Sequence, residues 1–312
     1  MKTVNISFNS ADGKTRIHGV KWTREDKNYV GVLHIIHGMI DHISRYEELA
    51  EYFSDRGFLV VGFDMLGHGA SAADDGQYGY FTEHDPAKVL IRDIYTMYIN
   101  IHKEYPDLNY FMLGHSMGSY LLRMYICRHP DTIDGAIFMG AGYISPEVCT
   151  FGQTLCGGMA KIYGTHHRSH LMEAMIFSGP YRKFDMLGKD FDNSWLCKDH
   201  DRLKIHYADP LSTFTFTLNG FYGLMQVVKY TCSEKNLALL PKDLPMLFVS
   251  GDEDPVGDLG RGVKKVYDMY SGSGAEDISM KLFKGDRHEL FNETDRADVF
   301  DYMYKWVNDR NL

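Results

Sequence analysis

The five-residue pattern Gly114–Gly118 (GHSMG) is typical of a nucleophilic serine. The apolar run 110–113 in front of it predicts a buried strand, and residues 119–128 behind it predict a helix. A sharp turn between strand and helix lifts a serine hydroxyl clear of the sheet. We therefore predict that Ser116 is a catalytic nucleophile. The alternative is a glycine-rich turn with an exposed serine.

A serine needs two further residues to react at neutral pH: a histidine that takes its proton and a carboxylate that orients the histidine. On sheet-based enzymes these follow the serine in the order acid, then histidine. The predicted strand Pro245–Ser250 leads into an acidic loop, residues 251–258. The predicted strand Ser279–Phe283 leads to His288. Ligands bind beyond the carboxyl ends of strands in such sheets, so we expect both loops beside Ser116.

Four carboxylates lie in the acidic loop: Asp252, Glu253, Asp254 and Asp258. We predict that Asp254 is the catalytic acid, because it lies one turn past the strand end and Pro255 stiffens the loop after it. Asp252 is the main alternative. If Asp252 is not catalytic, its carboxylate is expected to accept hydrogen bonds from nearby backbone N–H groups. We predict that His288 is the base because of its place after the last strand.

A third loop follows the predicted strand Val30–Ile36 and begins with His37 and Gly38. A backbone N–H from this loop, with the N–H of the residue after the nucleophile, can hold the oxyanion that forms during acyl transfer. This assigns the main-chain N–H groups of Met39 and Met117 as donors. An ordinary strand-end turn is the alternative reading of this loop.

Together these motifs resemble those of the monoacylglycerol lipase and lysophospholipase family of α/β-hydrolases, which is also called serine aminopeptidase-like. The matching pieces are His37–Gly38, Arg45–Tyr46, Gly62–Ser71 (GFDMLGHGAS), Gly114–Gly118, Ser250–Pro255 (SGDEDP) and Arg287–Glu289. The resemblance implies Ser116 as nucleophile, Asp254 as acid and His288 as base. It also implies the N–H groups of Met39 and Met117 as oxyanion donors.

Two stretches depart from the family pattern. The loop after Met39 reads Ile40, Asp41 and His42, where relatives typically carry a glycine and a glutamate, and Leu66 stands where arginine is usual. None of these positions belongs to the predicted triad, so the departures concern the polar end of the pocket. His68, in the same stretch as Leu66, is read as a structural hydrogen-bonding residue rather than a catalytic one.

Strands alternate with helices along the chain, which predicts a mostly parallel sheet covered on both faces. The resemblance implies an α/β-hydrolase fold with an inserted helical cap. We expect the catalytic domain at residues 1–142 and 243–312 and the cap at residues 143–242. Turns or loops are expected at Gly260–Gly262 and Ser271–Gly274. The eight expected strands are Val4–Phe8, Arg16–Trp22, Val30–Ile36, Phe58–Phe63, Tyr110–Leu113, Gly135–Met139, Met246–Ser250 and Ser279–Phe283.

Composition favours a globular enzyme: 312 residues, of which 44% are apolar and 24% charged. The net charge of −9 argues against a nucleic-acid partner and gives no general attraction to anionic membranes. No signal peptide and no membrane-spanning run are expected. The five scattered cysteines predict reduced thiols, and hence a cytoplasmic protein. Membrane contact, where it occurs, is expected to be transient and through the cap.

The sequence therefore predicts a serine carboxylic ester hydrolase acting on a monoacylglycerol- or lysophospholipid-like ester. The alternatives are a small-ester or thioester hydrolase, an aminopeptidase-like serine hydrolase, and a non-catalytic binding protein on the same fold. A complete set of serine, acid and histidine argues against the last. His166 and His170 could share a helix face, but the glutamate of a zinc-binding H-E-x-x-H pattern is missing. No metal or organic cofactor is expected, and the oligomeric state stays open.

Overall fold

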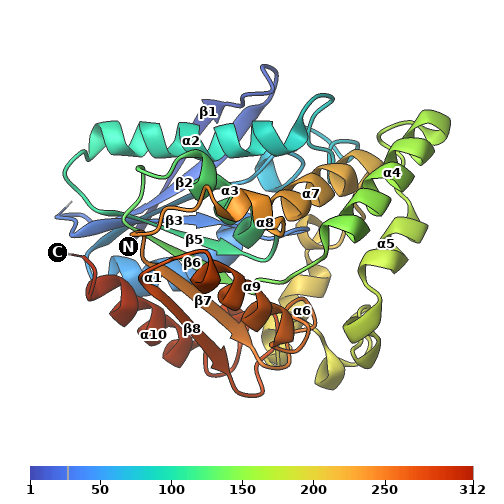
Figure 1. Cartoon of the computed structure of the whole chain (residues 1–312). Coiled ribbons are helices and arrows are strands. Elements are labelled where there is room, and N and C mark those ends of the chain that lie inside the picture. Colours follow the sequence, from blue (N-terminus) through green and yellow to red (C-terminus); the bar gives the residue numbers. More distant parts are fainter. Residues whose placement is uncertain (27, 312) are drawn as a thin grey trace.

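One eight-stranded sheet organises the computed structural model, which describes residues 1–26 and 28–311 (Figure 1). The strands are β1 (Lys2–Asn9), β2 (Arg16–Thr23), β3 (Gly31–Ile36), β4 (Phe58–Phe63), β5 (Tyr110–His115), β6 (Gly135–Met139), β7 (Met246–Gly251) and β8 (Ile278–Phe283). Their order is β1-β2-β4-β3-β5-β6-β7-β8. β2 is antiparallel to β1 and β4, and the other neighbours are parallel. The predicted mostly parallel sheet is therefore confirmed.

The central strands are buried on both faces because their apolar side chains point alternately into two cores. On β5, Tyr110 and Met112 enter one core, and Phe111 and Leu113 enter the other. The first core is closed by α2 (Pro86–Glu104), α3 (Met117–Arg128) and α9 (Arg261–Gly272). The second core is closed by α1 (Glu47–Ser54) and α10 (Arg296–Asn308).

Helix α9 corrects the sequence analysis, which expected turns at Gly260–Gly262 and Ser271–Gly274. The structure instead has a helix from Arg261 to Gly272, while Gly260, Ser273 and Gly274 lie in turns as expected. Val263, Val266 and Tyr270 form its buried face. Burying three such side chains outweighs the roughly 1 kcal/mol that an internal glycine costs a helix, so tertiary packing overrides the local propensity.

Between β6 and β7 the chain is helical, and we call residues 143–242 the inserted segment. Its helices are α4 (Pro146–Tyr163), α5 (His170–Ile176), α6 (His200–Ala208), α7 (Leu218–Thr231) and α8 (Glu234–Leu237). α7 packs against α4 and also against α2 and α3. α4 and α5 project beyond the edge of the sheet, at the right of Figure 1. The remaining short helices are η1 (Ile43–Tyr46), η2 (Gly69–Ser71), η3 (Gly179–Lys183), η4 (Phe191–Asn193), η5 (Pro210–Ser212) and η6 (Leu290–Asn292).

The parallel part of the sheet brings the predicted functional loops to one edge. β3, β5, β6, β7 and β8 are consecutive neighbours and run in the same direction. The loops that follow β3, β5, β7 and β8 carry Met39, Ser116, Asp254 and His288 respectively. Among the described residues, no helix is both long and apolar enough to cross a lipid bilayer.

Candidate active site

Ser116 occupies a strained turn between β5 and α3, with φ 53° and ψ −116°. The turn leaves no room for side chains at its flanking glycines. A Cβ on Gly114 would lie 2.3 Å from the carbonyl oxygen of Gly118, and a Cβ on Gly118 would lie 2.1 Å from that of Ile36. The half-buried Ser116 lines a cavity. Strain of this kind is held in place only by the surrounding packing and gathers at functional sites.

Asp254 and His288 lie in direct contact beneath this cavity. His288 Nδ1 is 3.0 Å and 3.1 Å from the two carboxylate oxygens of Asp254. Ser250 and Val256 also donate hydrogen bonds to this carboxylate, at 3.0 Å and 2.8 Å. Burial opposes ionisation of Asp254, but His288 and the other donors lower its pKa below the ordinary value. A carboxylate at Nδ1 fixes the tautomer in which Nε2 of His288 can accept a proton.

The other carboxylates of the acidic loop have different partners. Asp252 Oδ1 accepts a hydrogen bond from the backbone N–H of Gly285 at 2.6 Å, in the loop that leads to His288. Asp258 pairs with the exposed Arg261 at 2.8 Å. Of the four acidic residues in this loop, all of which the structure describes, only Asp254 contacts the histidine.

The predicted oxyanion donors open on the same cavity as Ser116. Met39 and Met117 both line its wall. Within residues 1–26 and 28–311, neither of their backbone N–H groups donates to a protein acceptor. Gly38 lets the loop approach closely, since a Cβ there would lie 3.3 Å from Ser116 Cβ. Two unpaired N–H groups beside a serine can bind a developing negative charge.

His37 and His68 hold in place the loop after β3, residues 37–42, which we call the oxyanion loop. His37 accepts a hydrogen bond from the Met65 N–H at Nε2 (2.9 Å), and its Nδ1 donates to the Gly38 carbonyl (2.8 Å). His68 Nε2 accepts from the Ile40 N–H at 3.4 Å. Burial lowers the pKa of His37, and it lowers that of His68 to about 3. Both rings are therefore neutral and serve as structural hydrogen-bonding groups.

Ile40, next to Met39, has a backbone conformation that favours glycine. Its φ is 54°, in the left-handed region that β-branched residues rarely adopt. Such a conformation persists in a non-glycine residue only when the surrounding contacts hold it, and here His68 accepts a hydrogen bond from the Ile40 N–H.

A buried ionic network joins the oxyanion loop to residues 284–289 after β8, which carry His288 and which we call the histidine loop. The sequence analysis did not predict this network. The Arg45 guanidinium donates to Asp41 at 2.9 Å and to both oxygens of Glu289 at 2.8 Å and 2.7 Å. Asp41 and Glu289 are only 2% and 4% exposed. Tyr46 adds a hydroxyl 2.7 Å from Asp41 and 2.8 Å from Nδ1 of His115. Arg45 stood in a matched motif, which was the only signal for it in the sequence.

Both carboxylates of this network are ionised at neutral pH. Burial opposes the charge on Glu289, but Arg45 lowers its pKa to about 2. The same guanidinium, against the same desolvation, holds the pKa of Asp41 well below its ordinary value. Burial also disfavours the charge on Arg45, but its two carboxylate partners raise its pKa well above the usual range. The network is therefore a fixed set of charges beside Ser116 and His288 in the cavity wall.

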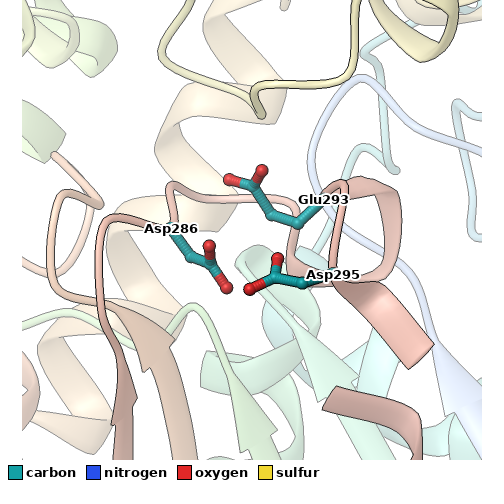
Figure 2. Close-up of side chains that lie close together, drawn as sticks. All are labelled: Asp286, Glu293 and Asp295. Carbon is teal, nitrogen blue, oxygen red and sulfur yellow. The ribbon is translucent and has the colours of Figure 1, made fainter. Parts of the chain in front are cut away.

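A cluster of three carboxylates lies on the loop that carries His288 and on the residues just after it (Figure 2). Oxygens of Asp286, Glu293 and Asp295 lie within 4.8 Å of one another, a spacing at which carboxylates can hold a metal ion. The ammonium of Lys198, from the inserted segment, is 2.5 Å from Asp286 and 3.8 Å from Glu293. Glu293 also accepts the backbone N–H groups of Lys198 and Arg287. Lys198 thus supplies positive charge to the cluster and fastens the inserted segment to the loop.

A cavity of about 1140 Å³ lies over Ser116. Its wall contains Ser116, His288, Met39 and Met117, so it joins the predicted nucleophile, base and oxyanion donors. The inserted segment supplies much of the rest of the wall, including Tyr143, Phe177, Tyr181, Trp195, Phe214 and Leu224. The arrangement can therefore hold an acyl group against a serine under a mostly apolar cover.

Residues 27–295 match the family model described as serine aminopeptidase, S33 (Hydrolase_4). This chain belongs to that family of α/β-hydrolases. The monoglyceride lipase homolog of Monkeypox virus is 28% identical over 279 residues, or 88% of each chain. Caffeoylshikimate esterase of Arabidopsis thaliana is 30% identical over 292 residues, or 91% of this chain and 80% of that one. A crystallised carboxyl esterase from Bacillus coagulans, in complex with glycerol, has a TM-score of 0.89, 27% identity and 100% coverage of both chains.

These comparisons confirm the α/β-hydrolase fold and the family that the motifs indicated. The protein is a serine hydrolase of the esterase and lipase type. The names of these two relatives, at 28% and 30% identity, refer to different substrates. Membership of the family by itself therefore leaves the substrate open.

Exchanging the carboxylate beside His288 tests the acid. Asp254→Asn should lower kcat by about 10⁴, because an amide favours the wrong imidazole tautomer. Asp252→Asn should leave kcat within a fewfold of the wild type, because Asp252 only bonds the Gly285 N–H. Steady-state kinetics on a p-nitrophenyl ester measures both. A larger loss in Asp252→Asn than in Asp254→Asn would overturn the assignment.

Removing the cation of the buried network should cost stability in a pH-dependent way. In Arg45→Met, Asp41 and Glu289 lose their partner, and breaking such a pair costs about 3–5 kcal/mol at pH 8. In the wild type the pKa of Glu289 is lower in the folded than in the unfolded protein. Glu289 therefore adds to the free energy of unfolding at pH values above its unfolded-state pKa, and this contribution is lost as the pH falls toward about 2. The unpaired carboxylates of the variant protonate more readily, so its deficit should shrink between pH 8 and pH 5.

Urea unfolding at both pH values measures this difference. Arg56→Met is a matched control, because Arg56 is exposed and lies over the ring of Tyr52. It should change the free energy of unfolding by no more than about 0.5 kcal/mol at either pH. An Arg45→Met deficit that stays constant with pH would contradict the electrostatic account.

Proposed function

We propose that the protein hydrolyses esters of fatty acids with a small polar alcohol, of the monoacylglycerol or lysophospholipid type. The observation that carries this proposal is the cavity of about 1140 Å³ over Ser116. It exceeds the roughly 300–1,000 Å³ of an ordinary small-molecule site. Its wall contains several aromatic and aliphatic side chains of the inserted segment. A short acyl group would leave most of this apolar space unfilled, whereas a long acyl chain would fill it and remove apolar surface from water.

The proposed reaction begins when His288 Nε2 takes the proton of Ser116 and the serine oxygen attacks the ester carbonyl. Asp254 holds the ring through Nδ1 and stabilises the positive charge that forms on it. The N–H groups of Met39 and Met117 bind the oxyanion. When the tetrahedral intermediate collapses, the alcohol leaves with the proton from His288.

The second half of the reaction frees the fatty acid. His288 takes a proton from a water molecule, and the resulting hydroxide attacks the acyl-enzyme carbonyl on Ser116. The oxyanion again forms beside the N–H groups of Met39 and Met117. When this intermediate collapses, Ser116 regains its proton from His288 and the acid departs. In both halves of the reaction His288 is the only group of the proposed triad that takes up and returns a proton, while water and the leaving alcohol are its partners.

An aminopeptidase-like activity, the main alternative, needs a free carboxylate for the substrate ammonium. Four carboxylates line the cavity: Asp41, Glu173, Asp258 and Glu289. Asp41 and Glu289 share Arg45. Asp258 pairs with Arg261, and the fourth accepts a hydrogen bond from a threonine hydroxyl. Because three of the four carboxylates are already paired with arginines, the cavity favours an uncharged acyl group.

We propose that the inserted segment, residues 143–242, acts as a cap that also touches lipid surfaces. Large apolar side chains are exposed on α4 and α5: Val148, Phe151, Ile162, Tyr163, Leu171 and Met175. Exposed apolar side chains gathered on two helices mark an interaction surface. Transient contact there would bring the cavity close to a lipid substrate. The five free cysteines support the cytoplasm as its compartment.

A fluorophosphonate probe tests the nucleophile. The wild type should be labelled at Ser116, and Ser116→Ala should lose both the label and ester turnover, by about 10⁴-fold or more. Ser119→Ala is the matched control, because the hydroxyl of Ser119 donates to the Ser116 carbonyl and the residue is buried. That variant should still be labelled. Labelling of Ser116→Ala at another serine would remove the proposed nucleophile.

A series of acyl chain lengths tests the substrate. kcat/KM for p-nitrophenyl esters and monoacylglycerols should rise from acetyl toward long chains. Each methylene that enters the cavity contributes up to about 0.8 kcal/mol, or nearly fourfold. The rise should stop where the chain fills the cavity. A steady fall from acetyl onward would instead identify a small-ester hydrolase, and turnover of aminoacyl amides alone would identify the peptidase alternative.

A further inference from the structure

Trp195, in the inserted segment, lies directly on the ring of His288. The two ring centroids are 5.2 Å apart, and the ring planes differ by 21°, which is a stacked arrangement. The indole also makes edge and tilted contacts with Tyr181 and Phe177, whose centroids lie at 5.5 Å and 5.9 Å. All four side chains line the cavity. The indole is therefore part of the cavity wall and in contact with the proposed base.

The backbone around Trp195 is fixed to the histidine loop. The N–H of His288 donates to the Trp195 carbonyl at 3.4 Å, and the N–H of Glu289 donates to that of Leu196 at 2.7 Å. The guanidinium of Arg287 donates to the Ser194 carbonyl at 2.6 Å. These bonds set the height of the indole above the imidazole, so the stacking does not depend on the side chain alone.

Apart from Asp254, the groups around His288 are neutral or already paired with another charge. An aromatic face can therefore stabilise a positive charge on this ring. Asp254 holds Nδ1, and the ring of His115 lies on another side with its centroid at 4.8 Å. Burial lowers the pKa of His115, so it stays neutral and does not repel a charged neighbour. Glu289, next in the chain, is already paired with Arg45. Burial and nearby negative charge raise the pKa of Tyr181 well above its usual range, so its phenol stays neutral.

The geometry points to Trp195 as a positioning residue of the active centre: its indole face holds the His288 ring and stabilises the imidazolium that forms during each proton transfer. This inference rests on the proposed function. An aromatic face attracts a cation, and tryptophan does so more strongly than phenylalanine. The attraction exists only while His288 is charged, so it favours the transition state over the ground state and acts on kcat.

The test is the pH dependence of kcat/KM for a p-nitrophenyl ester in Trp195→Leu and Trp195→Phe. The leucine variant should lose roughly three- to thirtyfold in kcat at the plateau. Its acidic limb should move to lower pH by roughly 0.5 to 1.5 units, because a less stabilised imidazolium gives up its proton more easily. In Trp195→Phe, both kcat and the pH of the acidic limb should lie between those of the wild type and of Trp195→Leu. A role in packing alone would lower kcat without moving the limb.

Phe177→Leu is the matched control. Phe177 contacts Trp195 and lines the cavity, and none of the described ring contacts joins it to His288. It should change KM and leave the acidic limb in place. A limb in Trp195→Leu that stays at the wild-type pH or moves to higher pH would overturn the inference. So would an equal shift in Phe177→Leu.

Fluorinated tryptophan separates electrostatics from shape, and it serves if Trp195→Leu fails to fold. Fluorine withdraws electron density from the indole face, so the acidic limb should move to lower pH with each added fluorine. Trp22 and Trp306 belong to the second core and are not among the cavity-lining residues, so fluorination in a Trp195→Phe background should have no effect. An unchanged limb in the fluorinated wild type would overturn the inference. Loss of probe labelling and turnover in the unmodified wild type would instead refute the proposed function.

Discussion

The active centre depends on one buried cation. Arg45 binds Asp41, which turns the oxyanion loop, and Glu289, which follows the proposed base. These two loops follow different strands and share no main-chain hydrogen bond among the described residues. The guanidinium therefore sets the distance between the donors for an oxyanion and the histidine. Its five N–H groups in a rigid fork suit this bridging role, which a lysine could not fill with the same geometry.

The network also explains why the strained backbone nearby is tolerated. Ser116 and Ile40 both have positive φ, and each such residue costs of order 1–3 kcal/mol. Asp41 bonds the Gly38 N–H beneath the oxyanion loop at 3.0 Å, and His68 bonds the Ile40 N–H. Fixed charges and neutral histidines thus hold the loop in a shape that its own sequence disfavours. The strain places N–H groups and a hydroxyl on one cavity, where they can act on the same carbonyl.

The inserted segment contributes to the chemistry as well as to the cover. Its residues 194–198 are bonded to the loop that carries His288 through backbone groups, through Arg287, and through the ion pair of Lys198 with Asp286. The same stretch presents Trp195 to the imidazole. In the proposed mechanism, movement of the segment would therefore alter both access to the cavity and the surroundings of the proposed base, because the same contacts serve both.

The sequence by itself determined the strands of the sheet, the helix after Ser116 and the loops that bear chemistry, because short apolar runs and a glycine-flanked serine are local signals. It also singled out Asp254 and His288, whose contact needed the fold to be seen. The Arg45 network, the helical state of Arg261–Gly272 and the stacking of Trp195 were decided only by tertiary structure. Each depends on burial or on partners far apart in the chain: a helix propensity is overridden by a packed face, and an ion pair or a stacked ring has no local sequence signature.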